Sequence, residues 1–235
     1  MHKNSELMFR EYGAKYVADH LLVLEIGPEA FPSTLQRICN RTGKQWDTLD
    51  IKEDPRLIYQ TSDPYNYPIK SGSYDVVLSC SVIEHVPRIW TWMRESVRIM
   101  KPGGLAIIGA PCSWPYHEAP VDCWRIYPEG MKALVEDAGL SVELSEWGTL
   151  EHPEISYALP GRSFEHQPEP YRGQAMKLVE LGAFPMEKSF DMICIARKPE
   201  TKPSRLRKAW HPHWHRRFSN TLPSSPAGKS PHAGR

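Results

Sequence analysis

Apolar residues along this chain form two kinds of segment, short continuous runs and longer stretches with helical spacing. The stretches with helical spacing lie at residues 5–20, 33–40, 89–100 and 128–138. The short runs have the length of strands and lie at residues 21–26, 46–51, 57–60, 74–79, 105–109, 140–147 and 190–196. Because strands that alternate with helices form crossover units, this order predicts a doubly wound, mainly parallel α/β sheet.

Local signals mark the ends of two of these helices. Ser33 and Thr34 can cap the second helix, and Gly43 can close it. Pro128 suits the first turn of the last helix, and Gly139 follows its end. These residues set the predicted boundaries of both helices.

Residues 74–110 contain the crossover unit with the clearest pattern. A strand ends in Ser79-Cys80-Ser81, an amphipathic helix follows, and Lys101-Pro102-Gly103-Gly104 separates that helix from the next strand. In parallel α/β sheets, ligands bind at the carboxyl ends of the strands. We therefore expect a ligand beside residues 79–81.

Two connections are longer than a minimal α/β domain needs. Residues 111–127 are rich in aromatic side chains, and residues 151–185 are rich in Pro and Gly, so both are candidate substrate loops. From Lys202 onward the chain has eight Lys or Arg and no Asp or Glu. This composition predicts one domain over residues 1–199 and a basic, disordered tail over residues 200–235.

The composition is typical of a soluble protein, with 40% hydrophobic and 24% charged residues in a chain of 235. There is no run of about 18 apolar residues that could span a membrane, and the first residues lack the apolar core of a signal peptide. The five cysteines form no C-x-x-C pair, which favours free thiols over a disulfide framework. We therefore expect a cytoplasmic protein.

Two short motifs connect this pattern to a known family. Glu25-Ile26-Gly27-Pro28 follows the first strand, and Glu84-His85-Val86 follows the fourth. With residues 74–110, these motifs resemble the class I S-adenosylmethionine (SAM) dependent methyltransferases, particularly the methyltransferase type 11 branch. The resemblance covers roughly residues 15–147 and, more weakly, residues 190–198. It implies a Rossmann-like, seven-stranded sheet whose last strand is antiparallel, with S-adenosyl-L-methionine as the cofactor.

The turn after the first strand is the expected site for the methionine part of that cofactor. A glycine lets the backbone approach a ligand closely, and the resemblance implies contacts from Gly27, Pro28 and the acidic Glu25. Glu29 and Phe31 stand where the family has two further glycines, so the turn departs from the family pattern. An ordinary glycine at a strand end would explain Gly27 as well.

Two acidic residues are candidates for binding the nucleoside. Asp50 ends the second strand and could accept hydrogen bonds from both ribose hydroxyls. Asp63 and Pro64, together with Tyr65, resemble the family segment that covers adenine. Either acid could instead cap a turn.

The reactive end of the cofactor is expected near the fourth strand, where Ser79, Cys80 and Ser81 leave room for a methyl group. His85 could act as a general base or could pack as a structural residue. His117 lies in the aromatic loop that should face the acceptor, and we favour it over His85 as the base. That loop could also simply pack on the core.

The sequence predicts no metal site, because His211, His213 and His215 lie in the tail without fixed geometry. Basic and aromatic residues of the tail could contact nucleic acid or anionic lipid. We expect a solvated tail instead, and no nucleic-acid partner.

These observations predict a SAM-dependent methyltransferase that acts on a hydroxyl of a small-molecule acceptor, such as a sugar or a secondary metabolite. The aromatic loop resembles those of small-molecule and sugar-modifying methyltransferases. Two alternatives stay open: a non-catalytic binding or scaffold domain, and an RNA or protein methyltransferase that uses the basic tail. The sequence leaves the acceptor atom and the oligomeric state open.

Overall fold

The computed structural model describes residues 1, 3–41, 45–114, 116–117, 120–151 and 191–200. The chain divides into two units, Met1–Lys202 and Pro203–Arg235, and all described residues lie in the first. The predictions for residues 151–185 and for the tail therefore fall almost entirely outside the described residues. Within the described ranges, no helix is both long and apolar enough to cross a membrane.

The described residues form a seven-stranded sheet in the order β3-β2-β1-β4-β5-β7-β6. Neighbouring strands from β3 to β5 pair in parallel, whereas β7 pairs antiparallel with both β5 and β6. The predicted α/β sheet with an antiparallel last strand is thus confirmed. The strands are β1 (Val23–Ile26), β2 (Trp46–Asp50), β3 (Tyr59–Gln60), β4 (Tyr74–Cys80), β5 (Met100–Pro111), β6 (Ser141–Gly148) and β7 (Asp191–Arg197).

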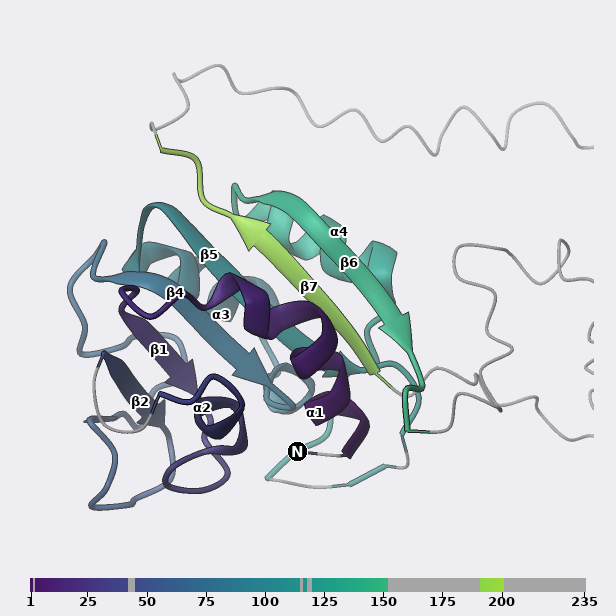
Figure 1. Ribbon diagram of the computed structural model, residues 1–235, viewed down its shortest axis with the longest axis horizontal. Coiled ribbons are helices and arrows are strands. Elements are labelled where there is room, and N and C mark those ends of the chain that lie inside the picture. The colour runs from purple at the N-terminus through teal and green to yellow at the C-terminus, as the bar shows by residue number, and fades with distance from the viewer. Residues whose placement is uncertain (2, 42–44, 115, 118–119, 152–190, 201–235) are drawn as a thin grey trace, which may run out of the picture. The chain divides into compact units, whose positions relative to one another are not determined.

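Helices cover both faces of this sheet. Figure 1 shows α1 in front of the sheet and α3 and α4 behind it. The helices are α1 (Lys3–Met8), α2 (Thr34–Ile38), α3 (Ile89–Ile99) and α4 (Pro128–Asp137), and a short 3₁₀ turn, η3, spans Ile83–His85.

Several predicted boundaries differ from the structure. The helix predicted over residues 5–20 is α-helical only to Met8, continues as π and 3₁₀ turns and ends at Tyr16. The second helix ends at Ile38, because Asn40 adopts the left-handed conformation (φ 52°) that closes helices. The predicted break at residues 101–104 lies inside β5 as an irregularity in its pairing with β4.

Alternate side chains of the strands point to opposite faces of the sheet, and each face has its own apolar core. In β4, Val76, Leu78 and Cys80 face the core that contains Phe9 of the N-terminal helical segment. Val77 points to the opposite face, into the core that includes Trp92 and Met93 of α3. Since successive side chains of a strand point to opposite faces, nearly continuous burial of β4 requires helices on both sides.

Asn4 in α1 joins the N-terminal segment to β6 and β7. Its side chain is fully buried, and its Nδ2 donates to the Gly148 carbonyl and to Asp191 Oδ2, both at 2.8 Å. Its Oδ1 accepts from the Leu150 amide at 2.6 Å. These three hydrogen bonds fix α1 across the ends of β6 and β7.

Candidate active site

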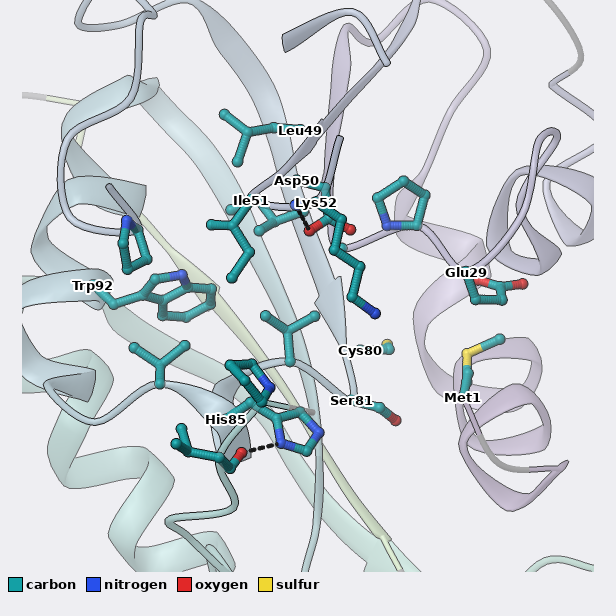
Figure 2. Close-up of a pocket in the computed structure, with 18 of the residues that line it drawn as sticks. Met1, Glu29, Leu49, Asp50, Ile51, Lys52, Cys80, Ser81, His85 and Trp92 are labelled. Carbon is teal, nitrogen blue, oxygen red and sulfur yellow. Dashed lines mark hydrogen bonds between the residues drawn. The ribbon is translucent and has the colours of Figure 1, made fainter. Parts of the chain in front are cut away.

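A cavity of about 720 Å³ opens at the carboxyl ends of β1, β2 and β4. Residues from the loops that follow these three strands line it, together with residues of the 111–127 connection. Figure 2 shows Asp50 and Ile51 on one side of the cavity and Ser81 and His85 on another. This is the edge at which open α/β sheets bind ligands, and the volume is in the range of small-molecule sites.

The turn after β1 can accept only glycine at position 27. Gly27 has φ 76°, and a Cβ added there would lie 2.3 Å from Cγ2 of Val82. Its amide donates to the Leu49 carbonyl at 2.9 Å, which closes the turn against β2. Gly27 and Pro28, which the sequence predicts as cofactor-binding residues, both line the cavity.

Glu29, which stands in place of a family glycine, has a local structural role. Its Oε1 accepts from the Thr34 amide at 2.7 Å, at the first turn of α2. Ser33 is the N-cap of this helix and accepts from the Gln36 amide at 3.0 Å, as predicted. The departure from the family pattern therefore adds a carboxylate at the start of α2, where the helix dipole favours negative charge.

Glu25 does not line the cavity but lies beneath the turn. It is 1% exposed, and its Oε2 accepts from Ser33 Oγ at 2.6 Å and from Trp46 Nε1 at 2.8 Å. Burial raises the pKa of Glu25 to about 7, although both hydrogen bonds act in the opposite direction. The carboxyl group thus joins β1, β2 and the cap of α2, where the resemblance implied a contact with the cofactor.

Asp50 lies at the end of β2 and lines the cavity. Its Oδ1 accepts from the Lys52 amide at 3.0 Å, which is the turn-capping contact that the sequence left open. Ile51, next to it, is 44% exposed and also lines the cavity. An exposed apolar side chain beside a carboxylate offers one surface for a ring and one acceptor for hydroxyl groups.

The segment after β3 divides between a turn and a wall of the cavity. Asp63 caps a turn, because its Oδ1 accepts from the Tyr65 amide at 2.8 Å, and it is not among the lining residues. Pro64 and Tyr65 do line the cavity. The guanidinium of Arg88 lies 3.9 Å from the centre of the Tyr65 ring and holds that ring in place.

Cys80 and Ser81 face the cavity at the end of β4, whereas Ser79 does not. Ser79 is 1% exposed, and its hydroxyl donates to the Ile26 carbonyl at 3.3 Å, so it joins β4 to β1. Ser81 adopts φ 56°, a left-handed conformation that is uncommon for serine. Such strain often occurs at functional sites.

His85 and His117 meet at the far wall of the cavity, although 31 residues lie between them in the sequence. Their rings pack edge to face, with centroids 4.9 Å apart. His85 Nδ1 lies 2.6 Å from the Val121 carbonyl (Figure 2), and His117 Nδ1 lies 3.3 Å from Asp122 Oδ2. Asp122 accepts two hydrogen bonds from Arg125, which hold its pKa well below the usual range.

Glu84 lies behind these two rings. Its side chain is 0% exposed, and its Oε1 is 3.8 Å from His85 Nε2. Neither of its carboxyl oxygens has a hydrogen-bond partner among the residues that the structure describes. Burial raises the pKa of Glu84 to about 7.

The aromatic connection after β5 is partly packed and partly exposed. Trp124 packs against the core of the α3 face, and its Nε1 donates to the Val86 carbonyl at 2.9 Å. Tyr116 is 72% exposed. The alternative that this loop packs on the core therefore applies to Trp124, whereas its contact with an acceptor stays a prediction.

Comparisons with known proteins agree with this architecture. Residues 20–108 match the family model described as a methyltransferase domain. A SAM-dependent methyltransferase from Archaeoglobus fulgidus has the same fold, with a TM-score of 0.55 and 19% identity, over 82% of this chain and 92% of that one. The matched segment is a little over a third of this chain, and it resembles a methyltransferase domain whose fold the chain shares.

Two further proteins to which the chain is similar differ in what they act on. This chain is 27% identical over 170 residues to the 27-O-demethylrifamycin SV methyltransferase of Amycolatopsis mediterranei (strain S699). The aligned segment covers 63% of this chain and 61% of that protein. Phosphoethanolamine N-methyltransferase 2 of Haemonchus contortus, solved with S-adenosyl-L-methionine, has a TM-score of 0.52 and 18% identity over 84% of this chain and 53% of that one. The chain spans 22% to 61% of the length of the first curated relatives that it matches.

Sequence reasoning missed several residues that shape the cavity of this methyltransferase fold. Val82 confines the first turn, Lys52 and Ile51 follow Asp50, and Met1 lines the cavity from the chain's beginning. Position after a strand could have indicated Ile51 and Val82, since an apolar residue at the carboxyl edge of a sheet has no core to enter. No signal in the sequence indicated Met1.

Proposed function

We propose that this protein is a methyltransferase that binds SAM in the 720 Å³ cavity and methylates a hydroxyl group of a small molecule, such as a sugar or secondary metabolite. The observation that carries the proposal is the division of the cavity. The β1–β2 side offers a tight turn, an apolar side chain and a carboxylate, whereas the opposite wall offers two histidines. The first set suits a nucleoside and the second suits proton transfer.

The residues of the cavity fit the parts of the cofactor. Asp50 has the position and charge to accept hydrogen bonds from ribose hydroxyls. Ile51 and Tyr65 offer apolar and aromatic surface for adenine, and the backbone at Gly27 and Pro28 offers close approach for the methionine part. When bound, SAM supplies an electrophilic methyl group, and the chain's task is to orient the acceptor and exclude water.

Glu25, Asp63 and Ser79 contribute to this binding by positioning the residues that line the cavity. Glu25 connects β1 to the cap of α2, and Ser79 connects β4 to β1. Asp63 shapes the turn that presents Tyr65. Cys80 and Ser81 leave space at the end of β4, between the nucleoside side and the histidines.

His117 is the residue that we assign as the general base for the acceptor hydroxyl. Its Nδ1 faces the carboxylate of Asp122, which orients the ring and stabilises a positive charge on it. His85 packs against His117 and is oriented by the Val121 carbonyl. The O-methyltransferase among the relatives favours a hydroxyl acceptor for this chain.

Calorimetric titration with SAM and with S-adenosylhomocysteine tests cofactor binding. We expect binding in the micromolar range, weakened about tenfold or more in Asp50→Asn because charge-assisted hydrogen bonds to the ribose are lost. Asp54→Asn is the matched control, since Asp54 pairs with Arg56 on the surface and does not line the cavity. Absence of binding to either compound would instead support a non-catalytic scaffold domain.

Turnover with a panel of hydroxylated acceptors tests the base. At saturating SAM, His117→Ala should lower kcat by about 10²- to 10⁴-fold, which is the range for loss of a general base. Full turnover of this variant would contradict the assignment.

A further inference from the structure

The buried carboxyl group of Glu84 lacks the partners that such groups normally have. It is 0% exposed, and within the described part of the chain neither of its oxygens has a hydrogen-bond partner. A buried carboxylate needs an ion pair, hydrogen bonds or a metal ion to offset its lost hydration. A neutral carboxyl group would not resolve this, because its O–H would also lack an acceptor among these residues.

The two neighbouring histidines present the nitrogen atoms that a metal ion requires. The contact of His85 Nδ1 with the Val121 carbonyl at 2.6 Å makes this nitrogen the N–H donor, and the lone pair is then on Nε2, 3.8 Å from Glu84 Oε1. The carboxylate of Asp122 likewise faces Nδ1 of His117. Metal-binding histidines characteristically donate their second N–H to a backbone carbonyl or a carboxylate.

We propose that Glu84, His85 and His117 bind a divalent first-row transition metal ion, of which Zn²⁺ is the representative. One potential ligand atom from each residue lies within 4.8 Å of the others. Ligands at about 2.0–2.2 Å from such an ion are roughly 3–3.5 Å apart, so the site must contract by about 1 Å on binding. Two imidazoles and one carboxylate are a donor set for Zn²⁺ or Fe²⁺ rather than for Ca²⁺ or Mg²⁺.

The position of this cluster indicates what the ion would do. His85 and His117 line the same cavity as Cys80 and Ser81, so the ion would lie on the acceptor side of that cavity. Three protein ligands leave coordination positions open for an oxygen of the acceptor. This role rests on the proposed function: His117 is the base in the protein without the ion, whereas in the protein with the ion bound His117 would be a ligand and the ion would lower the pKa of the acceptor hydroxyl.

Metal titration of the full-length protein, in the absence of SAM, tests the site. The background variant carries His211→Ala, His213→Ala and His215→Ala, so that these tail histidines do not contribute. The probes are Zn²⁺, measured by competition with a chromophoric chelator, and Co²⁺, measured by its visible absorption. We expect a single ion per chain, with Co²⁺ absorption of the intensity seen for four- or five-coordinate sites.

Variants of the cluster decide which residues bind the ion. Glu84→Gln and His117→Gln should each raise the Kd for Zn²⁺ by ~100-fold, and Asp122→Asn by about tenfold, because it only orients a ligand. His20→Gln is the matched control, since His20 precedes β1 at the opposite edge of the sheet, and it should leave the Kd unchanged. His117 is partly exposed, so His117→Gln keeps the test valid if the buried Glu84 variant fails to fold.

Two results would overturn the metal site. One is the absence of Zn²⁺ and Co²⁺ binding to the background variant, and the other is an unchanged Kd in His117→Gln. The outcomes also separate this site from the proposed function. Zn²⁺ binding without SAM binding would leave the metal site and contradict the methyltransferase, whereas full turnover in chelator would leave both the methyltransferase and the metal site and contradict only the role of the ion in the reaction.

Discussion

The turn at Gly27 provides the sharpest test of how this fold builds its cavity. Replacing Gly27 by Ala has two separate costs in the structure. The residue has φ 76°, where a Cβ is strained, and the new methyl group would lie 2.3 Å from Cγ2 of Val82. Val82 follows β4, so the clash couples the ends of β1 and β4.

The magnitude follows from these two terms. The left-handed conformation costs about 1–2 kcal/mol for a residue with a Cβ, and forcing a methyl group into a packed site typically costs about 1–3 kcal/mol. We therefore expect Gly27→Ala to lower the free energy of unfolding by about 2–5 kcal/mol. Because the turn lines the cavity, the Kd for SAM should rise as well.

A control variant and a rescue variant separate the two terms. Gly139 has φ 87°, but nothing lies within 4 Å of an added Cβ, so Gly139→Ala should show only the cost of conformation. Val82→Ala removes Cγ2 and should restore part of the stability when combined with Gly27→Ala. Urea unfolding followed by tryptophan fluorescence measures each free energy. The reasoning would be refuted if Gly27→Ala were no more destabilising than Gly139→Ala.

Two further substitutions test the contacts of buried polar groups. Folded Glu25 has its pKa raised from 4.5 to about 7 by burial, so stability should fall as pH rises through this window, by about 3 kcal/mol in all. Glu25→Gln should remove this loss. Urea midpoints of both proteins at about pH 5 and pH 8 would detect the difference. An equal fall in stability between these pH values in both proteins would contradict it. Asn4→Ala should cost about 3–5 kcal/mol, because it leaves the buried carboxylate of Asp191 and a carbonyl without Asn4 as a partner. Lys3→Ala is the control, because it loses only a surface pair with Glu6, and it should lower the free energy of unfolding by less than about 1 kcal/mol. Thermal or urea unfolding measures both variants, and similar losses in the two would refute the argument.

The sheet could be predicted from the sequence because its strands carry the signal themselves. β4 and β5 are apolar on both faces and are bounded by polar or turn residues, which is visible in any window of the chain. Helix ends were less accurate. Asn40 closes α2 in the left-handed conformation. An asparagine is equally common in turns, so the sequence favoured Gly43 as the residue that ends this helix.

The candidate site was predictable where the role of a residue depends on residues close to it in the sequence. The turn at Asp63 follows from its contact two residues ahead, and the Gly27 turn follows directly after β1. The role of Glu25 depends on Ser33 and Trp46, which reach it only once β2 and α2 have packed. A pairing of this kind leaves no local pattern, and neither does the contact of His85 with His117.

The antiparallel strand β7 has a consequence for how the protein is made. It is inserted between β5 and β6 and is buried along nearly its whole length, although it is the last strand in sequence among the described residues. A nascent chain that has not yet emerged past Arg197 exposes two unpaired strand edges, which are sites for aggregation. The hydrogen bond from Asn4 to Asp191 can also form only after β7 has emerged. Translation thus delivers the centre of this half of the sheet last, and a ribosome that stalls before residue 191 leaves a chain that cannot complete its fold.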